Sequence, residues 1–141
     1  VLLDNIVDGD KWYSGLPNIY NRMDCFIRCD IDHGYQFSVM EAAACGIPVI
    51  ATDSGPTKEL TDAGGGILID CGDRSWSAEN LAKIREDIKK AVIYLRDNPK
   101  MAKQMGERGR KFIEENWQWI NFIENWRKFF KRGLESANKE M

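Results

Sequence analysis

Short apolar runs separated by turn residues characterise the first half of the chain. Continuous runs at residues 25–27, 49–51 and 67–69 are typical of buried strands, and a weaker alternation at residues 1–7 is a fourth candidate. Residues with helical spacing lie between them, at 16–23, after Ser38 and at 56–62. This alternation predicts an α/β fold, in which helices flank a Rossmann-like parallel sheet of three to four strands.

The second half of the chain changes to helical spacing. Residues 78–97 carry a regular apolar face, Asn98 and Pro99 break that helix, and residues 99–115 form a more polar one with a solvated basic face. Residues 118–137 form the last helix, whose aromatic stripe would usually be core. The apolar face of the first helix is Leu81, Ile84, Ile88, Ala91, Val92 and Leu95. The expected inward residues of the second are Met101, Met105, Phe112 and Ile113, and the aromatic stripe of the last consists of Trp119, Phe122, Ile123, Trp126, Phe129 and Phe130.

Near the start of the chain, Pro17 suits the first turn of a helix over residues 16–23, which Asp24 ends. Trp12 and Tyr13 precede that helix in an expected loop. They either stack on a nucleotide base or, as is more common, cover an edge of the core.

Length and composition fit one ordinary globular domain over residues 1–141, with an α/β unit at 1–75 and a helical segment at 76–141. The net charge of −2 gives no basic bias for nucleic acid, and no apolar run is long enough to cross a bilayer. Because Val1, Leu2 and Leu3 are followed at once by Asp4 and Asn5, we expect no signal peptide and a cytoplasmic protein.

The four cysteines do not form a C-x-x-C pair, and the chain has one histidine. A zinc site would need thiols from scattered positions, so we expect no metal site. Reduced, buried thiols are the expected state, with the first two in or beside a strand. The cysteines are Cys25, Cys29, Cys45 and Cys71.

The strongest local motif lies between two predicted strands. Ser38 and Glu41 have the S-x-x-E spacing of a helix capping box, Gly46 is a helix stop, and Pro56 suits the first turn of the next helix. A glycine loop that enters a helix N-terminus presents unpaired N–H groups to an anion such as a diphosphate. In the alternative interpretation, the glycines serve a tight turn and Glu41 only caps its own helix.

This segment resembles the donor-binding core of the group 1 retaining nucleotide-sugar glycosyltransferases, which have the two-lobed GT-B fold. Their motif is Glu-Gly-Phe-Gly-x-x-x-x-Glu-Ala-x-Ala-x-Gly-x-Pro-Val-x-Ala, and Glu41 takes the place of its second glutamate. The resemblance extends over roughly residues 14–120. The positions in register after Glu41 are Ala42, Ala44, Gly46, Pro48, Val49 and Ala51.

The resemblance implies a partial GT-B C-terminal lobe that binds a nucleoside-diphosphate sugar, with no obligatory metal or cofactor. Glu41 would accept hydrogen bonds from the ribose hydroxyls, and His33 would approach the transferred sugar. Backbone N–H groups would hold phosphate or sugar oxygens at Gly34, Tyr35, Gln36, Phe37 and Ser38.

The chain departs from the family motif at two positions. His33 replaces the first glutamate and Gln36 replaces the second loop glycine, and a neutral imidazole does not supply a carboxylate's charge. The family's phosphate-binding arginine and lysine come from earlier strands and have no match here. Asp30 and Asp32 add negative charge near the proposed diphosphate and face either solvent or a sugar hydroxyl.

Two functions therefore remain open. The first is a glycosyltransferase lobe that needs a missing N-terminal lobe, or a homodimer partner that pairs with the strand edge near residues 25–28. The second is a non-catalytic module that acts as an interaction or regulatory subunit. In the resembled family the final helix crosses toward the other lobe, so we expect part of the aromatic stripe to meet a surface outside this domain.

A nicotinamide-dependent oxidoreductase fits poorly. The glycines at residues 64–66 are not a dinucleotide fingerprint, because a strand follows them and none precedes them.

Overall fold

Three parallel strands form the centre of the computed structural model, which describes residues 12–31, 37–53 and 57–137. The strands are β1 (Phe26–Arg28), β2 (Val49–Thr52) and β3 (Gly66–Ile69), in the order β1-β2-β3. The register pairs Ile27 with Ile50 and Ile50 with Ile67, and both ladders are parallel. The α/β prediction is therefore confirmed, and β1 lies at an edge among the described strands.

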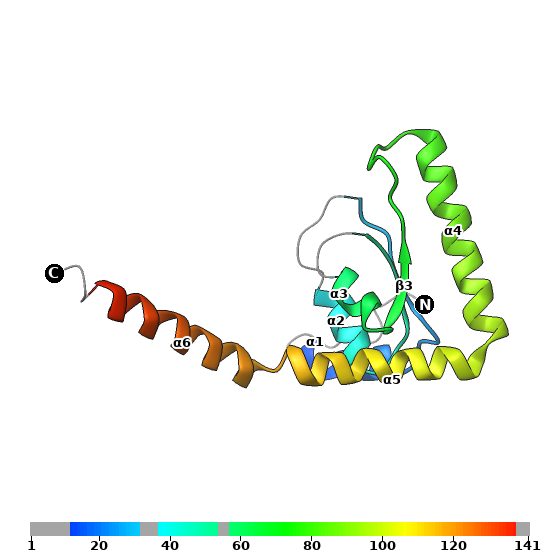
Figure 1. Ribbon diagram of the computed structural model, residues 1–141. Helices are drawn as coiled ribbons and strands as arrows, with labels where there is room; N and C mark the ends of the chain where they lie inside the picture. Colours follow the sequence, from blue (N-terminus) through cyan, green and yellow to red (C-terminus); the bar gives the residue numbers. More distant parts are fainter. Residues whose placement is uncertain (1–11, 32–36, 54–56, 138–141) are drawn as a thin grey trace.

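Helices cover both faces of this sheet (Figure 1). On one face lie α2 (Phe37–Ala44) and α3 (Thr57–Asp62), and α1 (Trp12–Tyr20) packs beside α2. On the other face α4 (Ala78–Asp97) packs on β2 and β3. All four residues of β2 are buried because helices cover both of its sides, as its continuous apolar run predicted.

A glycine in the left-handed region ends α2. Gly46 has a φ of 76°, its N–H donates to the Ala43 carbonyl oxygen at 2.8 Å, and the Ile47 N–H donates to that of Ala42 at 3.0 Å. These two bonds form a Schellman cap, which an L side chain at Gly46 would strain. The predicted helix stop is confirmed, and α3 ends in the same way at Gly64.

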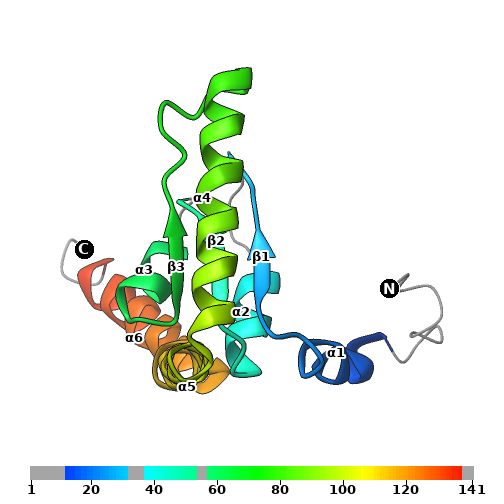
Figure 2. The same cartoon turned by 90° about the vertical axis from the view of Figure 1, so that its right-hand side faces the viewer.

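The fifth helix, α5 (Pro99–Asn116), crosses beneath the amino ends of the strands, where Figure 2 shows it nearly end-on. Two buried glycines allow this close approach. A Cβ at Gly106 would lie 1.9 Å from the carbonyl oxygen of Gly46, and a Cβ at Gly65 would lie 2.6 Å from the Cα of Gly109. The turns that follow α2 and α3 therefore both rest on α5.

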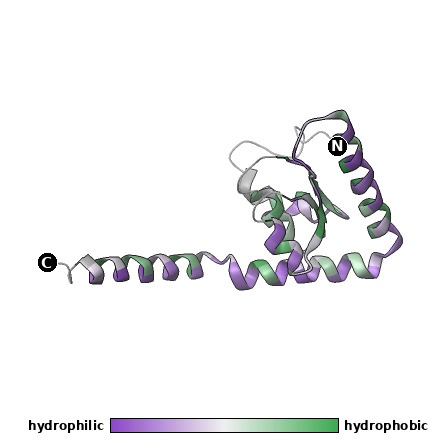
Figure 3. Ribbon diagram, turned by 45° about the horizontal axis from the view of Figure 1, so that its top comes forward, coloured by the Kyte–Doolittle hydropathy of each residue, from purple (hydrophilic) through white to green (hydrophobic). Residues whose placement is uncertain are grey.

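The last helix, α6 (Trp119–Ala137), extends away from the α/β body (Figures 1 and 3). Its aromatic rings contact one another edge to face, as Phe122 and Trp126 do at 5.9 Å between ring centroids. Trp119 is 78% exposed and Phe129 is 64% exposed. The stripe is therefore not core within the described chain, and the expectation that part of it meets a surface outside this domain stays a prediction.

Several smaller expectations are also wrong. The first helix begins at Trp12 and has Pro17 inside it, so the backbone of Trp12 and Tyr13 is helical and not a loop. Ile27 is exposed because α4 packs on β2 and β3 and not on the edge strand. Leu81 and Met101 are exposed as well. Residues 1–11, with the expected strand at 1–7, fall outside the described residues, as does Pro56.

Replacement of Gly106 by alanine is expected to destabilise the chain by about 3 kcal/mol or more, because the new methyl group would overlap backbone that cannot move without breaking the cap of α2. Thermal unfolding followed by circular dichroism should show a loss of roughly 10 °C. Gly133→Ala is the matched control, since Gly133 is also a helical glycine but has nothing within 4 Å of the place that a new methyl group would take. Equal melting temperatures for the Gly106 and Gly133 variants would contradict this packing.

Candidate functional site

The carboxyl ends of the three strands meet at the edge of the sheet opposite α5, which is where open α/β sheets bind ligands (Figure 2). The loops that follow β1 and β2 lead from this edge into α2 and α3. The candidate site is therefore built around Arg28, Asp30, Thr52 and the first turn of α2.

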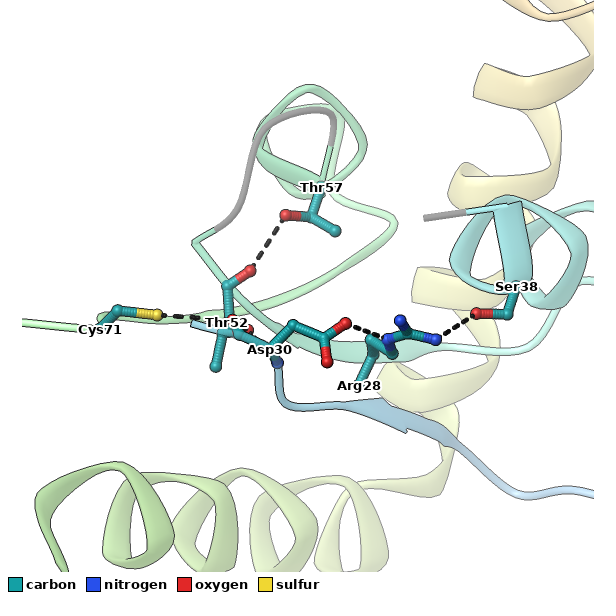
Figure 4. A network of polar contacts seen from close by, with 6 residues as sticks. All are labelled: Arg28, Asp30, Ser38, Thr52, Thr57 and Cys71. Atoms are coloured by element: carbon teal, nitrogen blue, oxygen red, sulfur yellow. Dashed lines mark hydrogen bonds and ion pairs between the residues drawn. The ribbon is translucent and has the colours of Figure 1, made fainter. Parts of the chain in front are cut away.

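A buried threonine joins the ends of β1 and β2. The Thr52 hydroxyl accepts a hydrogen bond from the Asp30 N–H at 2.9 Å and donates to the Asp30 carbonyl oxygen (Figure 4). Thr57, at the start of α3, donates from its hydroxyl to the Thr52 carbonyl oxygen at 3.0 Å. Both threonines are fully buried, so these bonds hold the strand ends and the start of α3 in one arrangement.

Arg28 is a functional candidate that sequence reasoning missed. Its Nε–H donates to the Asp30 carboxylate, and its Nη1–H donates to the Ser38 hydroxyl at 3.2 Å (Figure 4). The side chain is 35% exposed and that of Asp30 is 19% exposed. Asp30 was expected to face solvent or a sugar; instead it pairs with a cation at the amino end of α2, and the pair offsets its negative charge.

The predicted capping box is wrong. Ser38 lies inside α2, which begins at Phe37, and its hydroxyl accepts from Arg28. Glu41 points to a different partner, the Tyr20 hydroxyl, which donates to Glu41 Oε2 at 2.8 Å. Ser38 therefore bonds to Arg28 and Glu41 bonds to Tyr20, whereas the S-x-x-E spacing had predicted that Ser38 and Glu41 cap the same helix.

Tyr20 is buried and Glu41 is partly buried. Burial, the hydrogen bond to Glu41 and the carboxylate's charge together raise the pKa of the Tyr20 phenol well above its ordinary value. The phenol therefore stays protonated and serves as a hydrogen-bond donor to the carboxylate.

Of the site residues expected from the sequence, the structure describes Phe37, Ser38 and Glu41, all on α2. Phe37 is 71% exposed at the start of the helix. The remaining expected residues, His33, Gly34, Tyr35 and Gln36, lie outside the described residues.

The turn after β3 reaches the same edge. Arg74 adopts a left-handed φ of 58°, and its Nη2–H donates to the Asp53 carbonyl oxygen at 3.2 Å. Asn80, buried at the start of α4, donates from Nδ2 to the carbonyl oxygens of Cys71 and Ser75 at 2.9 Å each. Sequence reasoning missed these contacts, since nothing in residue spacing predicts a side chain that bridges two loops.

The four cysteines are free thiols, and only Cys71 is fully buried. Cys29 is exposed, which corrects the expectation for that residue, because it follows the edge strand. Desolvation raises the pKa of the thiols of Cys25, Cys29 and Cys45, which favours the protonated thiol over the thiolate. Within residues 12–31, 37–53 and 57–137, no cluster of three histidine, cysteine or acidic side chains could hold a metal ion.

Two surface hollows have linings that do not include Arg28, Asp30, Thr52 or Ser38. One, of about 540 Å³, lies between β3 and α4 and is lined by Ile67, Asp87 and Tyr94. The other, of about 510 Å³, lies by the α2–β2 turn and α5, with Asp24, Pro48 and Lys103 in its lining.

Comparison with protein families assigns the fold and motif. Residues 6–112, most of the chain, match the family described as "Glycosyl transferases group 1". The chain belongs to this glycosyltransferase family. The match includes the strands, α2 and most of α5, and it confirms the resemblance inferred from residues 33–51.

Individual proteins that resemble this chain in sequence are also glycosyltransferases. An uncharacterised glycosyltransferase of Methanocaldococcus jannaschii is 30% identical over 70% of this chain and 23% of its own length. A GDP-mannose-dependent alpha-(1-6)-phosphatidylinositol monomannoside mannosyltransferase of Mycolicibacterium smegmatis is 36% identical over 57% of this chain and 18% of its own length. This glycosyltransferase chain thus spans about a fifth to a quarter of each relative.

Among solved structures, sucrose-phosphate synthase from Thermosynechococcus elongatus matches with a TM-score of 0.62 and 19% identity. The match covers 84% of this chain and 27% of that one, and it supports the fold. No helix in the described part of the glycosyltransferase chain combines the length and apolar character that a membrane span requires.

Proposed function

We propose that this glycosyltransferase chain is the donor-binding lobe of its enzyme and binds a nucleoside-diphosphate sugar at the carboxyl edge of its sheet. The observation that carries the proposal is the placement of the Arg28 guanidinium beside the first turn of α2. A cation and a helix N-terminus favour the same ligand, an anion.

The diphosphate is proposed to lie between Arg28 and the amino end of α2. The Arg28 fork already donates to Asp30 and Ser38, and its other N–H groups remain available for bidentate contacts with phosphate oxygens. Backbone N–H groups from Gly34 to Ser38 are proposed to complete this cradle. The same groups would stabilise the negative charge that develops on the leaving diphosphate during sugar transfer.

The nucleoside and the sugar are proposed to lie on opposite sides of the diphosphate. Glu41, one turn into α2, accepts a hydrogen bond from the ribose, while His33 approaches the transferred sugar. The oxygen Oε1 of Glu41 is the proposed acceptor, because Oε2 is held by Tyr20. No metal or other cofactor has a proposed role in this arrangement.

A mannosyl donor is the first candidate. Two relatives, at 32% and 36% identity, are named as GDP-mannose-dependent mannosyltransferases. Because the chain spans so little of these relatives, the acceptor is proposed to bind to the other lobe of the enzyme. This chain alone is expected to bind a donor weakly and to transfer sugar slowly or not at all.

Isothermal titration calorimetry with GDP-mannose, UDP-glucose and ADP-glucose tests the proposal. The wild-type chain should bind at least one donor, and Glu41→Gln should weaken that binding by roughly 5- to 10-fold because a charged acceptor becomes neutral. The melting temperature should hardly change, since the glutamine oxygen can still accept from Tyr20.

Glu107→Gln is the matched control for this change. Glu107 is an exposed residue of α5, at the edge of the sheet opposite the proposed site, and its substitution alters net charge equally. Its donor affinity should equal that of the wild type. A folded chain that binds none of the three donors would exclude the donor-binding proposal.

A second candidate function, the non-catalytic interaction module, is favoured by the exposed aromatic stripe of α6. Either function needs a partner surface for this helix, and we assign it to the missing lobe, since most of the relatives' length lies outside the aligned region. The stripe would bury large aromatic area there.

Truncation after Gln118 separates the two functions. Because α6 projects from the body, the truncated chain should keep its melting temperature and its donor affinity, and lose the self-association that an exposed aromatic face promotes. Light scattering and calorimetry measure these properties. An untruncated chain, residues 1–141, that associates through α6 but binds no donor would favour the interaction module.

A further inference from the structure

Within the proposed donor site, we infer that Tyr20 is a positioning residue, which holds the Glu41 carboxylate in the orientation that recognises a ribose hydroxyl. The inference rests on the proposed function. It assigns to a residue outside the glutamate motif the task of distinguishing ribonucleotides from deoxyribonucleotides.

Tyr20 is fixed in place before any ligand binds. It is the last residue of α1, 6% exposed, and it belongs to the core cluster that includes Val39 and Ala42 of α2. Its ring packs edge to face against Phe26 of β1, with ring centroids 5.8 Å apart and an interplanar angle of 64°. Contacts with a helix and a strand leave the ring little freedom to rotate.

The Tyr20 hydroxyl binds one of the two carboxylate oxygens of Glu41 and leaves the other for a ligand. It donates to Oε2 at 2.8 Å, and an ionised carboxylate accepts at both oxygens. With Oε2 held by a rigid donor, Oε1 is left for a second donor. A ribose hydroxyl is such a donor, and a 2′-deoxyribose lacks one of the two that a ribose offers.

The Tyr20–Glu41 hydrogen bond also lowers the conformational entropy that the Glu41 side chain loses when a ligand binds. A glutamate side chain has several rotatable bonds, and fixing them when the ligand binds weakens affinity. Since Tyr20 already fixes the carboxylate, this loss occurs during folding and not during ligand binding. The raised pKa of the Tyr20 phenol is consistent with this role, because the phenol keeps its proton and remains a donor.

The experiment compares four chains, which are the wild type, Tyr20→Phe, Glu41→Gln and the double variant. Calorimetry measures their affinities for GDP, UDP and ADP and for the 2′-deoxy form of each. The wild type should prefer the ribonucleotide it binds. Tyr20→Phe should weaken ribonucleotide binding by roughly 3- to 10-fold, leave the deoxynucleotide nearly unchanged and so reduce the preference. The Tyr20 change should have a much smaller effect in the Glu41→Gln background, because the glutamine oxygen is the group that accepts from Tyr20 and only a neutral amide nitrogen is left for the ribose.

A purely structural role for Tyr20 gives a different result. Tyr20→Phe would then lower the melting temperature and leave the ratio of ribonucleotide to deoxynucleotide affinity as in the wild type, which would overturn the inference. Tyr94→Phe, an exposed tyrosine of α4, is the control and should change neither quantity. If Tyr20→Phe does not fold, Glu41→Asp replaces it. Its carboxylate is one methylene shorter and no longer reaches the Tyr20 hydroxyl. An unchanged ratio of ribonucleotide to deoxynucleotide affinity in Glu41→Asp would also overturn the inference.

The two proposals can fail separately. A wild-type chain that binds no nucleoside diphosphate overturns the proposed function and this inference with it. A wild-type chain that prefers the ribonucleotide while Tyr20→Phe keeps the same preference overturns only the role of Tyr20.

Discussion

The two hydrogen bonds between the Thr52 hydroxyl and the backbone of Asp30 determine the geometry of the carboxyl edge. The β1–β2 ladder ends at Arg28, and the side chain of Thr52 continues the connection beyond it. The Thr57 hydroxyl, at the start of α3, donates a hydrogen bond to the Thr52 carbonyl oxygen and so joins α3 to the same strand ends. The strand ladder and the Thr52 bonds therefore both fix the chain from Arg28 to Asp30 against β2, and Arg28 bonds to Ser38 from this position.

The amino and carboxyl edges of the sheet make different kinds of contact. At the amino edge, backbone packs on backbone, because Gly106 and Gly109 let α5 approach the turns after α2 and α3. At the carboxyl edge, polar and charged side chains bond to the segments that follow the three strands, and Arg28 also bonds to Ser38 at the start of α2. Close packing at one edge thus anchors the carboxyl end of α2, and Arg28 contacts its amino end at the other edge.

Much of the fold could be predicted from the sequence, because the relevant signals are local. The apolar run of β2 and the stop at Gly46 depend only on neighbouring residues, and both are confirmed. The family resemblance, carried by Glu41 and the residues that follow it, is confirmed as well. The proposed roles of the loop residues His33 to Gln36 stay predictions.

Contacts between distant segments could not be predicted in this way. The Arg28–Ser38 and Tyr20–Glu41 bonds replace a capping box that the spacing favoured, since tertiary partners competed successfully for both side chains. The stripe of α6 has core composition but no surface to bury it in the described chain. Periodicity identifies an apolar face; it does not identify what covers that face.

The central claim is that the carboxyl edge, and not the amino edge, binds an anionic nucleotide sugar. Nuclear magnetic resonance of the ¹⁵N-labelled chain, titrated with GDP-mannose and UDP-glucose, tests it most directly. We predict shifts for the Arg28 guanidinium and for the amides of Ser38 and Glu41, with those of Gly106 and Gly109 unchanged. Shifts confined to α5, or no shift with either ligand, would contradict the account.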